Sequence, residues 1–181
     1  MRTNLLLLAL FASCGDPNGP LKIKGQQFDA RSVFYARTTN GQSGHGIALF
    51  LGDQPELCNA WRSGAYPAAE SVVQVNFYRG EGGASVDVDP GTYGVFNSGN
   101  GDQATAQIAG GGRFVVAQAG AYTGTCKTAT DLNAGLKGSV TFSGGDPISG
   151  DYELHFANGA LTGEFNAPLC DLTPAQFCPH Q

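Results

Sequence analysis

The sequence predicts an all-β fold, a single antiparallel β-sandwich or barrel-like domain of about ten strands with one short helix. Apolar and polar residues alternate with a period of two in several short segments. The chain also holds 27 glycines and 9 prolines, many of which fall between these segments as turn residues. Its 181 residues suit one domain, and no repeat or linker divides them.

The composition excludes some classes of function. Charged residues form 14% of the chain and the formal net charge is −5, so a basic surface for nucleic acid is absent. Hydrophobic residues reach 41%, which argues against a disordered chain. The sequence therefore indicates a folded, acidic domain that does not bind nucleic acid.

The N-terminus has the form of a secretory signal. A basic residue, Arg2, precedes the apolar run 5–12, which is shorter than the roughly 20 residues of a membrane-spanning helix. The run ends in Phe-Ala-Ser-Cys, which resembles the lipobox of bacterial lipoproteins. This resemblance implies cleavage before Cys14 and acylation of Cys14, and the following Gly15 implies the outer membrane. The alternative is an ordinary secretory signal.

We accordingly expect a lipid-anchored protein of the bacterial cell envelope. Residues 1–13 would be a lipoprotein signal peptide, 14–24 a lipidated tether and 25–181 the β-domain. Membrane lipid would be a partner through the acylated Cys14.

Four further cysteines, an even number in an exported chain, predict two disulfides with three possible pairings. We prefer a Cys170–Cys178 clip and a Cys58–Cys126 link, although the spacing allows each of the pairings. A zinc site is disfavoured because no C-x-x-C pair occurs.

The elements are expected in the following order. In the first strand, Val33, Tyr35 and Arg37 share one face, and Asn40-Gly41 forms the turn that follows. Pro55 begins the helix. The expected ranges are strands at 28–37, 47–51, 72–78, 85–88, 92–96, 103–108, 113–118 and 121–127, a helix at 54–62, and a three-strand meander at 139–143, 150–156 and 160–165.

Two resemblances concern the domain itself. Asp89-Pro90-Gly91-Thr92-Tyr93 resembles the tyrosine corner of immunoglobulin-like sandwiches, which implies that the Tyr93 hydroxyl binds the corner. Residues 138–172, with 57–61 and 90–93, resemble short lipoproteins of myxobacteria and related bacteria, whose G-x-F, A-P-x-C ending stands here at 163–170. That resemblance implies an envelope location and a β-fold, and it implies no activity or cofactor.

No catalytic constellation stands out. Ser43 lies near His45, but G-x-S-x-G is incomplete and no helix follows. His155 shares a strand face with Asp151 and Glu153, a pattern more typical of a solvated face than of a metal site. Glycosidase chemistry needs two carboxylates across a cleft. The candidates are Glu56, Glu70, Glu81, Glu153 and Glu164.

Two kinds of binding site remain open. Oxygen ligands for calcium could come from Asp87, Asp89, Asn97, Asn100 and Asp102, if their loops adjoin. A glycan platform could use the aromatic residues Trp61, Tyr66, Tyr78, Tyr93 and Tyr122. The sequence thus predicts a membrane-anchored, non-catalytic envelope lipoprotein with an interaction or structural role. The alternatives are a glycan- or calcium-binding module and, third, an envelope hydrolase.

Overall fold

The structure is a computed structural model that describes residues 19–40, 44–97, 110–123, 132–173 and 176. Within these ranges the chain forms eleven strands and one helix, so the predicted all-β fold with a short helix is confirmed. The helix lacks the length and apolar character needed to cross a membrane. The elements are β1 (Lys22–Ile23), β2 (Gln26–Gln27), β3 (Ser32–Asn40), β4 (Gly44–Gly52), α1 (Leu57–Ser63), β5 (Ala69–Glu81), β6 (Ala84–Ser85), β7 (Gly91–Val95), β8 (Arg113–Thr123), β9 (Asn133–Phe142), β10 (Ile148–Phe156) and β11 (Gly159–Ala167).

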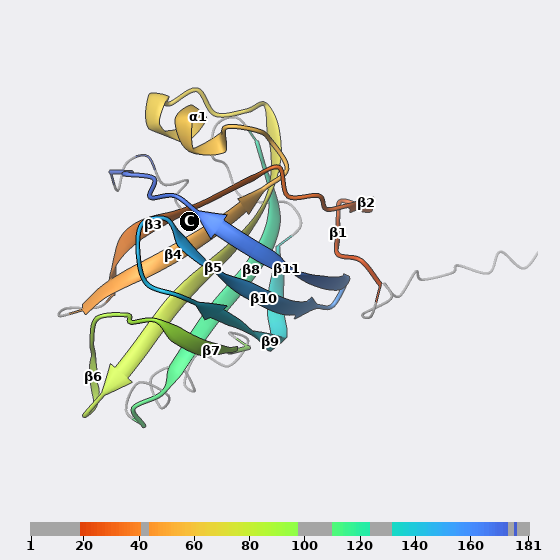
Figure 1. Cartoon of the computed structure of the whole chain (residues 1–181). Coiled ribbons are helices and arrows are strands. Elements are labelled where there is room, and N and C mark those ends of the chain that lie inside the picture. Colours follow the sequence, from red (N-terminus) through yellow and green to blue (C-terminus); the bar gives the residue numbers. More distant parts are fainter. Residues whose placement is uncertain (1–18, 41–43, 98–109, 124–131, 174–175, 177–181) are drawn as a thin grey trace, which may run out of the picture.

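One large sheet curls on itself, in the barrel-like form of the prediction (Figure 1). Its strands follow the order β11-β10-β9-β7-β8-β5-β4-β3. The two edges meet just after β11: the Tyr35 backbone N–H donates to Pro168 O at 3.0 Å, and the Cys170 N–H donates to Tyr35 O at 2.7 Å. Because these bonds join the first and last strands of the sheet, the inner face becomes a closed interior.

The sheet is not wholly antiparallel, which corrects the prediction in one place. Strand β7 lies between β8 and β9 and runs parallel to β8, with Val95 opposite Val115. Farther along, β8 and β9 pair directly with each other. The structure also merges the expected strand 113–118 with the described part of the expected strand 121–127, residues 121–123, into β8, because its residues pair without interruption along β5. The expected strand 103–108 lies outside the described residues.

The interior is filled by the inward-facing side chains of nearly every long strand. Alternation produces this core, since every second residue of a strand points inward. Its buried members are Leu21, Ile23, Phe28, Tyr35, Leu49, Leu51, Val73, Val75, Phe77, Tyr93, Val115, Ala117, Ala119, Ala121, Val140, Phe142, Ile148, Tyr152, Leu154, Phe156, Phe165 and Ala167.

The N-terminal part of the described chain belongs to the barrel. Leu21 and Ile23 are buried in the interior. The Leu21 N–H donates to Ala160 O and the Ala160 N–H donates to Gly19 O, both at 2.8 Å, so this segment is fastened beside the β10–β11 turn. The β-domain therefore begins by Gly19, and the predicted tether boundary at residue 24 is too late.

A second apolar cluster covers the outer face of β3, β4 and β5. Helix α1 places Leu57 and Trp61 against this face, and the Trp61 ring meets the rings of Phe34 and Phe50 edge-on. Figure 1 shows the helix lying outside the sheet. The helix begins later than predicted, since Glu56 before it has a left-handed backbone conformation with φ of 54°.

A disulfide between Cys58 and Cys170 joins α1 to the segment after β11. The preferred pairings, Cys58–Cys126 and Cys170–Cys178, are therefore wrong. The reason is the barrel closure: the end of β11 returns to β3, directly beneath the helix that carries Cys58. Cys126 and Cys178 lie outside the described residues.

Candidate functional site

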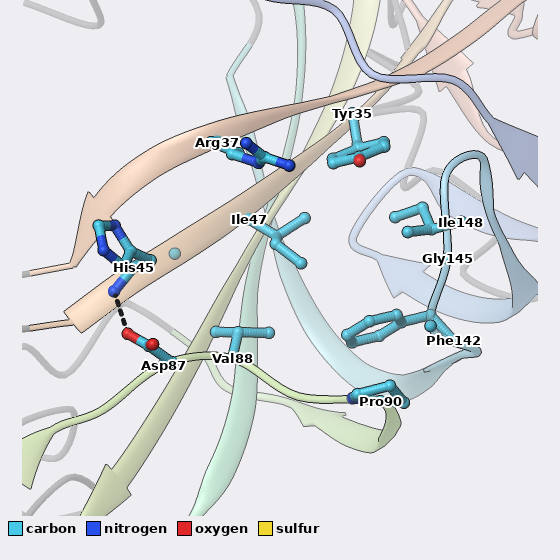
Figure 2. Close-up of a pocket in the computed structure, with 12 residues that line it drawn as sticks. Tyr35, Arg37, His45, Ile47, Asp87, Val88, Pro90, Phe142, Gly145 and Ile148 are labelled. Carbon is cyan, nitrogen blue, oxygen red and sulfur yellow. Dashed lines mark hydrogen bonds between the residues drawn. The ribbon is translucent and has the colours of Figure 1, made fainter.

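A pocket of about 280 Å³ opens at one end of the barrel, and we call it the mouth pocket. Four separate parts of the chain converge on it: β3, the start of β4, the segment before β7, and the β9–β10 connection (Figure 2). It lies at the end of the barrel opposite the β10–β11 turn, because β10 begins at the pocket and runs away from it. Its lining residues are Tyr35, Arg37, His45, Gly46, Ile47, Asp87, Val88, Pro90, Phe142, Gly144, Gly145 and Ile148.

The pleat of the β3–β4 hairpin explains which side chains reach the pocket. Tyr35 and Arg37 are two residues apart on β3 and point to the same face. Ile47 pairs with Arg37 across the hairpin and shares that face. Tyr35 is 4% exposed, whereas Arg37 is exposed at the rim. The barrel interior thus continues into the pocket, whose rim on β3 carries the cation Arg37.

The pocket has an apolar side and a polar side. Figure 2 shows Tyr35 and Arg37 above Ile47, with Ile148 and Phe142 across the pocket. Among the described residues, Arg37 forms no ion pair and the Tyr35 hydroxyl forms no hydrogen bond. Two hydrogen-bond donors therefore lie across the pocket from the apolar side chains of Phe142 and Ile148.

Asp87 supplies the acidic group of the pocket, and it is already engaged. The His45 N–H donates to Asp87 Oδ1 at 2.9 Å, and the Val88 N–H donates to His45 O at 3.1 Å. These bonds fasten the start of β4 to the segment before β7. Asp87 therefore forms part of one wall of the pocket. The dashed line in Figure 2 marks its hydrogen bond with His45.

Asp89 anchors the neighbouring corner. Its carboxylate pairs with Arg113 at 2.7 Å and with Arg79 at 3.3 Å. The Tyr93 hydroxyl donates to Asp89 O at 2.7 Å, which is the contact that the tyrosine-corner resemblance implied. Burial raises the pKa of Tyr93 to about 12, so the hydroxyl keeps its proton at neutral pH.

These contacts bear on the predicted calcium ligands. Two arginines neutralise Asp89, and one oxygen of Asp87 accepts a backbone hydrogen bond. In the described ranges no three His, Cys, Asp or Glu side chains gather as metal ligands do. Asn100 and Asp102 lie outside those ranges, as do Cys14 and Ser43.

The predicted glycan platform is not assembled. Trp61, Tyr93 and Tyr122 are each at most 4% exposed and pack inside the protein. Tyr78 stacks on Phe114, and the Tyr66 hydroxyl donates to Gln176 O at 3.2 Å. The aromatic side chains therefore stabilise the fold rather than share one exposed face.

The carboxylates named for hydrolysis do not converge on a cleft. Glu56, Glu81 and Glu164 are exposed on different elements. Glu153 is also exposed and lies 2.8 Å from His155 Nε2, in the solvated strand face that the sequence indicated.

Glu70 differs from the others because it is buried beneath α1, 3% exposed. The Trp61 indole N–H donates to both of its oxygens, at 3.2 and 3.3 Å. Burial raises the pKa of Glu70 to about 7, while the bond from Trp61 lowers it and the nearby Asp53 charge raises it. Burial likewise raises the pKa of Tyr122 to about 12, with the Glu70 charge adding to the shift.

Sequence reasoning did not single out Tyr35 and Arg37 as site residues. The sequence did hold a signal for them, because the alternation of apolar and polar residues placed both on the same strand face as the apolar Val33. An arginine on an otherwise apolar face indicates a rim or a site, but only the fold brings Phe142 and Ile148 opposite it.

Comparison with protein-family models, curated proteins and solved structures finds no match to this chain.

Proposed function

We propose that the protein is a membrane-anchored, non-catalytic lipoprotein of the bacterial envelope that binds a small ligand in the mouth pocket. The observation that carries the binding role is the pocket itself, which combines an apolar wall with two donor side chains, Tyr35 and Arg37, that have no partner among the described residues. Such a combination is typical of small-molecule sites, in which apolar surface supplies affinity and a few polar groups fix orientation. The mouths of β-barrels are a frequent place for them.

The anchoring part of the proposal has separate support. The apolar run and the cysteine at its end resemble a lipoprotein signal, and the myxobacterial lipoproteins resemble this chain in its final third. The outer membrane is the proposed location because Gly15 follows the cysteine. Acyl chains on Cys14 would hold the domain stably, since each buried methylene contributes about 0.8 kcal/mol.

A binding role fits the site better than hydrolysis does. In the part of the chain that the structure describes, the pocket holds one carboxylate, Asp87, and that group is bonded to backbone. His45 lines the pocket but faces no nucleophile among its lining residues.

One experiment tests the anchor. The Cys14→Ser variant and the wild type are expressed in a bacterium that processes lipoproteins, and processing and membrane fractionation are compared. We expect the variant to stay unprocessed and to incorporate no labelled palmitate. Identical processing and labelling would refute anchoring through Cys14.

A second experiment tests the pocket. Small uncharged, anionic and cationic phenyl compounds are titrated into the ¹⁵N-labelled protein, and amide shifts are followed by NMR. We expect saturable shifts at residues 44–48 and 142–148, which Val88→Phe should abolish by filling the pocket. Val86→Phe, on the same segment but outside the lining, should leave the shifts intact. The absence of saturable shifts there with every compound would refute the binding role.

A further inference from the structure

The polar groups of the mouth pocket define the chemistry of its ligand. Arg37 stands at the rim of a barrel interior that is otherwise filled by apolar side chains. Its guanidinium presents a planar fork of donors that matches a carboxylate in two parallel bonds. Arg37 lines the pocket and forms no ion pair with a described residue.

Tyr35 adds a second donor deeper in the pocket. The residue as a whole is 4% exposed. The hydroxyl has no hydrogen-bond partner among the described residues, and Tyr35 lines the pocket. Tyr35 and Arg37 are two residues apart on one strand face, so one ligand group can reach both donors.

The remaining walls limit the rest of the ligand. Phe142 and Ile148 lie across from the two donors, and Ile47 and Val88 add further apolar surface to the lining. The volume of about 280 Å³ lies just below the range of roughly 300–1,000 Å³ typical of drug-sized ligands. A compact apolar body therefore fits, and a long chain would have to extend into solvent.

The charge of the ligand is limited by Asp87, which lines the same pocket. A second negative charge on the ligand would meet this carboxylate, and like charges repel more strongly where water is partly excluded. A carboxylate carries one negative charge, whereas a phosphate monoester carries about 1.5 to 2 at neutral pH. The pocket therefore favours a single carboxylate.

We propose that the mouth pocket binds a small organic monocarboxylate, with its carboxylate on Arg37 and the Tyr35 hydroxyl and its apolar body against Ile47, Phe142 and Ile148. This inference rests on the proposed binding function and adds the chemical class of the ligand. It makes Arg37 the residue that determines charge selectivity, and Tyr35 a positioning donor.

The test uses four compounds of similar shape and different charge: phenylacetate, phenylacetamide, phenethylamine and phenyl phosphate. Dissociation constants are measured by NMR titration of the purified full chain. We expect phenylacetate to bind most tightly, at least about tenfold more tightly than phenylacetamide, because a hydrogen bond to a charged group contributes more than a neutral one.

Variants assign the effect to residues. Arg37→Gln should weaken phenylacetate binding about ten- to hundredfold and leave phenylacetamide binding unchanged. Arg37→Lys should restore part of the loss, and Tyr35→Phe should weaken binding several-fold. The matched control is Arg31→Gln, because Arg31 is exposed just before β3 and does not line the pocket.

The outcomes separate this inference from the proposed function. Equal affinity for phenylacetate and phenylacetamide, or unchanged phenylacetate affinity in Arg37→Gln, would overturn the monocarboxylate class while leaving a ligand pocket in place. Tighter binding of phenyl phosphate than of phenylacetate would overturn the preference for one charge. If none of the four compounds binds, both the class and the proposed binding function fail.

Discussion

The buried Glu70 predicts that the folded state loses stability as the pH rises through neutrality. Its carboxyl lies under α1, where burial raises the pKa from 4.5 to about 7. The folded protein therefore holds a proton at Glu70 over a range of pH in which the unfolded chain has released it. Since proton binding is then stronger in the folded state, stability decreases with rising pH between these two values.

The size of the effect follows from the shift. One pKa unit corresponds to 1.36 kcal/mol, so a shift from 4.5 to about 7 corresponds to roughly 3 kcal/mol as an upper limit. The full contribution is present below pH 4.5, falls progressively, and is lost above pH 7. Glu70→Gln removes the titration and keeps an oxygen to accept the Trp61 N–H.

The assay is urea denaturation of wild type and Glu70→Gln at several pH values from 4.5 to 8, with the free energy of unfolding extrapolated to water. We expect the two proteins to converge at the acid end and the variant to be more stable by about 2–3 kcal/mol at the alkaline end. Subtracting the free energy of unfolding of the wild type from that of the variant at each pH removes the contribution of all other titrating groups. The exposed Glu164→Gln should show no such pH-dependent difference.

Two results would refute the reasoning. If the difference between wild type and Glu70→Gln is independent of pH, burial does not shift the carboxyl. If Glu70→Gln is the less stable protein at pH 8, the ionised form is the one that the fold stabilises.

The remaining predictions concern two features that hold the barrel together: the disulfide between Cys58 and Cys170, and the close packing of Gly159 against Pro20. Cys58→Ala opens a disulfide that spans 112 residues and should lower the free energy of unfolding by about 3–4 kcal/mol. Dithiothreitol should bring the wild type to the same value in urea denaturation, and a loss below 1 kcal/mol would show that the bridge contributes little. Gly159→Ala should lower the melting temperature by several degrees, because Gly159 has φ of 139° and a Cβ there would lie 2.6 Å from Pro20 O. Gly94→Ala is the control, since no atom lies within 4 Å of its Cβ position, and equal shifts in the two variants would refute the close contact.

The sequence was sufficient for the elements whose signals are local. Alternation identified β4, β5 and the β9–β10–β11 meander. In β10 one face is buried and the other is largely open to solvent, whereas β4 and β5 are also covered on part of their outer face by the cluster under α1. The tyrosine corner was also predictable, since the donor and acceptor are four residues apart. These features depend on neighbours in the chain.

The features that the sequence could not predict depend on distant segments. The insertion of β7 parallel to β8 requires a pairing that no local pattern encodes. The expected strand at 28–37 begins only at Ser32, so Phe28 enters the interior from outside the strand while Phe34 packs under α1. The Cys58–Cys170 bridge and the mouth pocket likewise form only after the barrel closes.

The hydrogen bonds that hold the N-terminal segment beside the β10–β11 turn determine how an anchored molecule would be oriented relative to its membrane. With lipid on Cys14 as proposed, Gly19 follows after 19 − 14 = 5 residues, a reach of at most about 17 Å. Strand β10, from Ile148 at the pocket to Phe156 at the turn, adds about 27 Å in the other direction. The tethered barrel would therefore point its mouth away from the lipid surface, so that its ligand arrives from the aqueous compartment rather than by lateral diffusion in the bilayer.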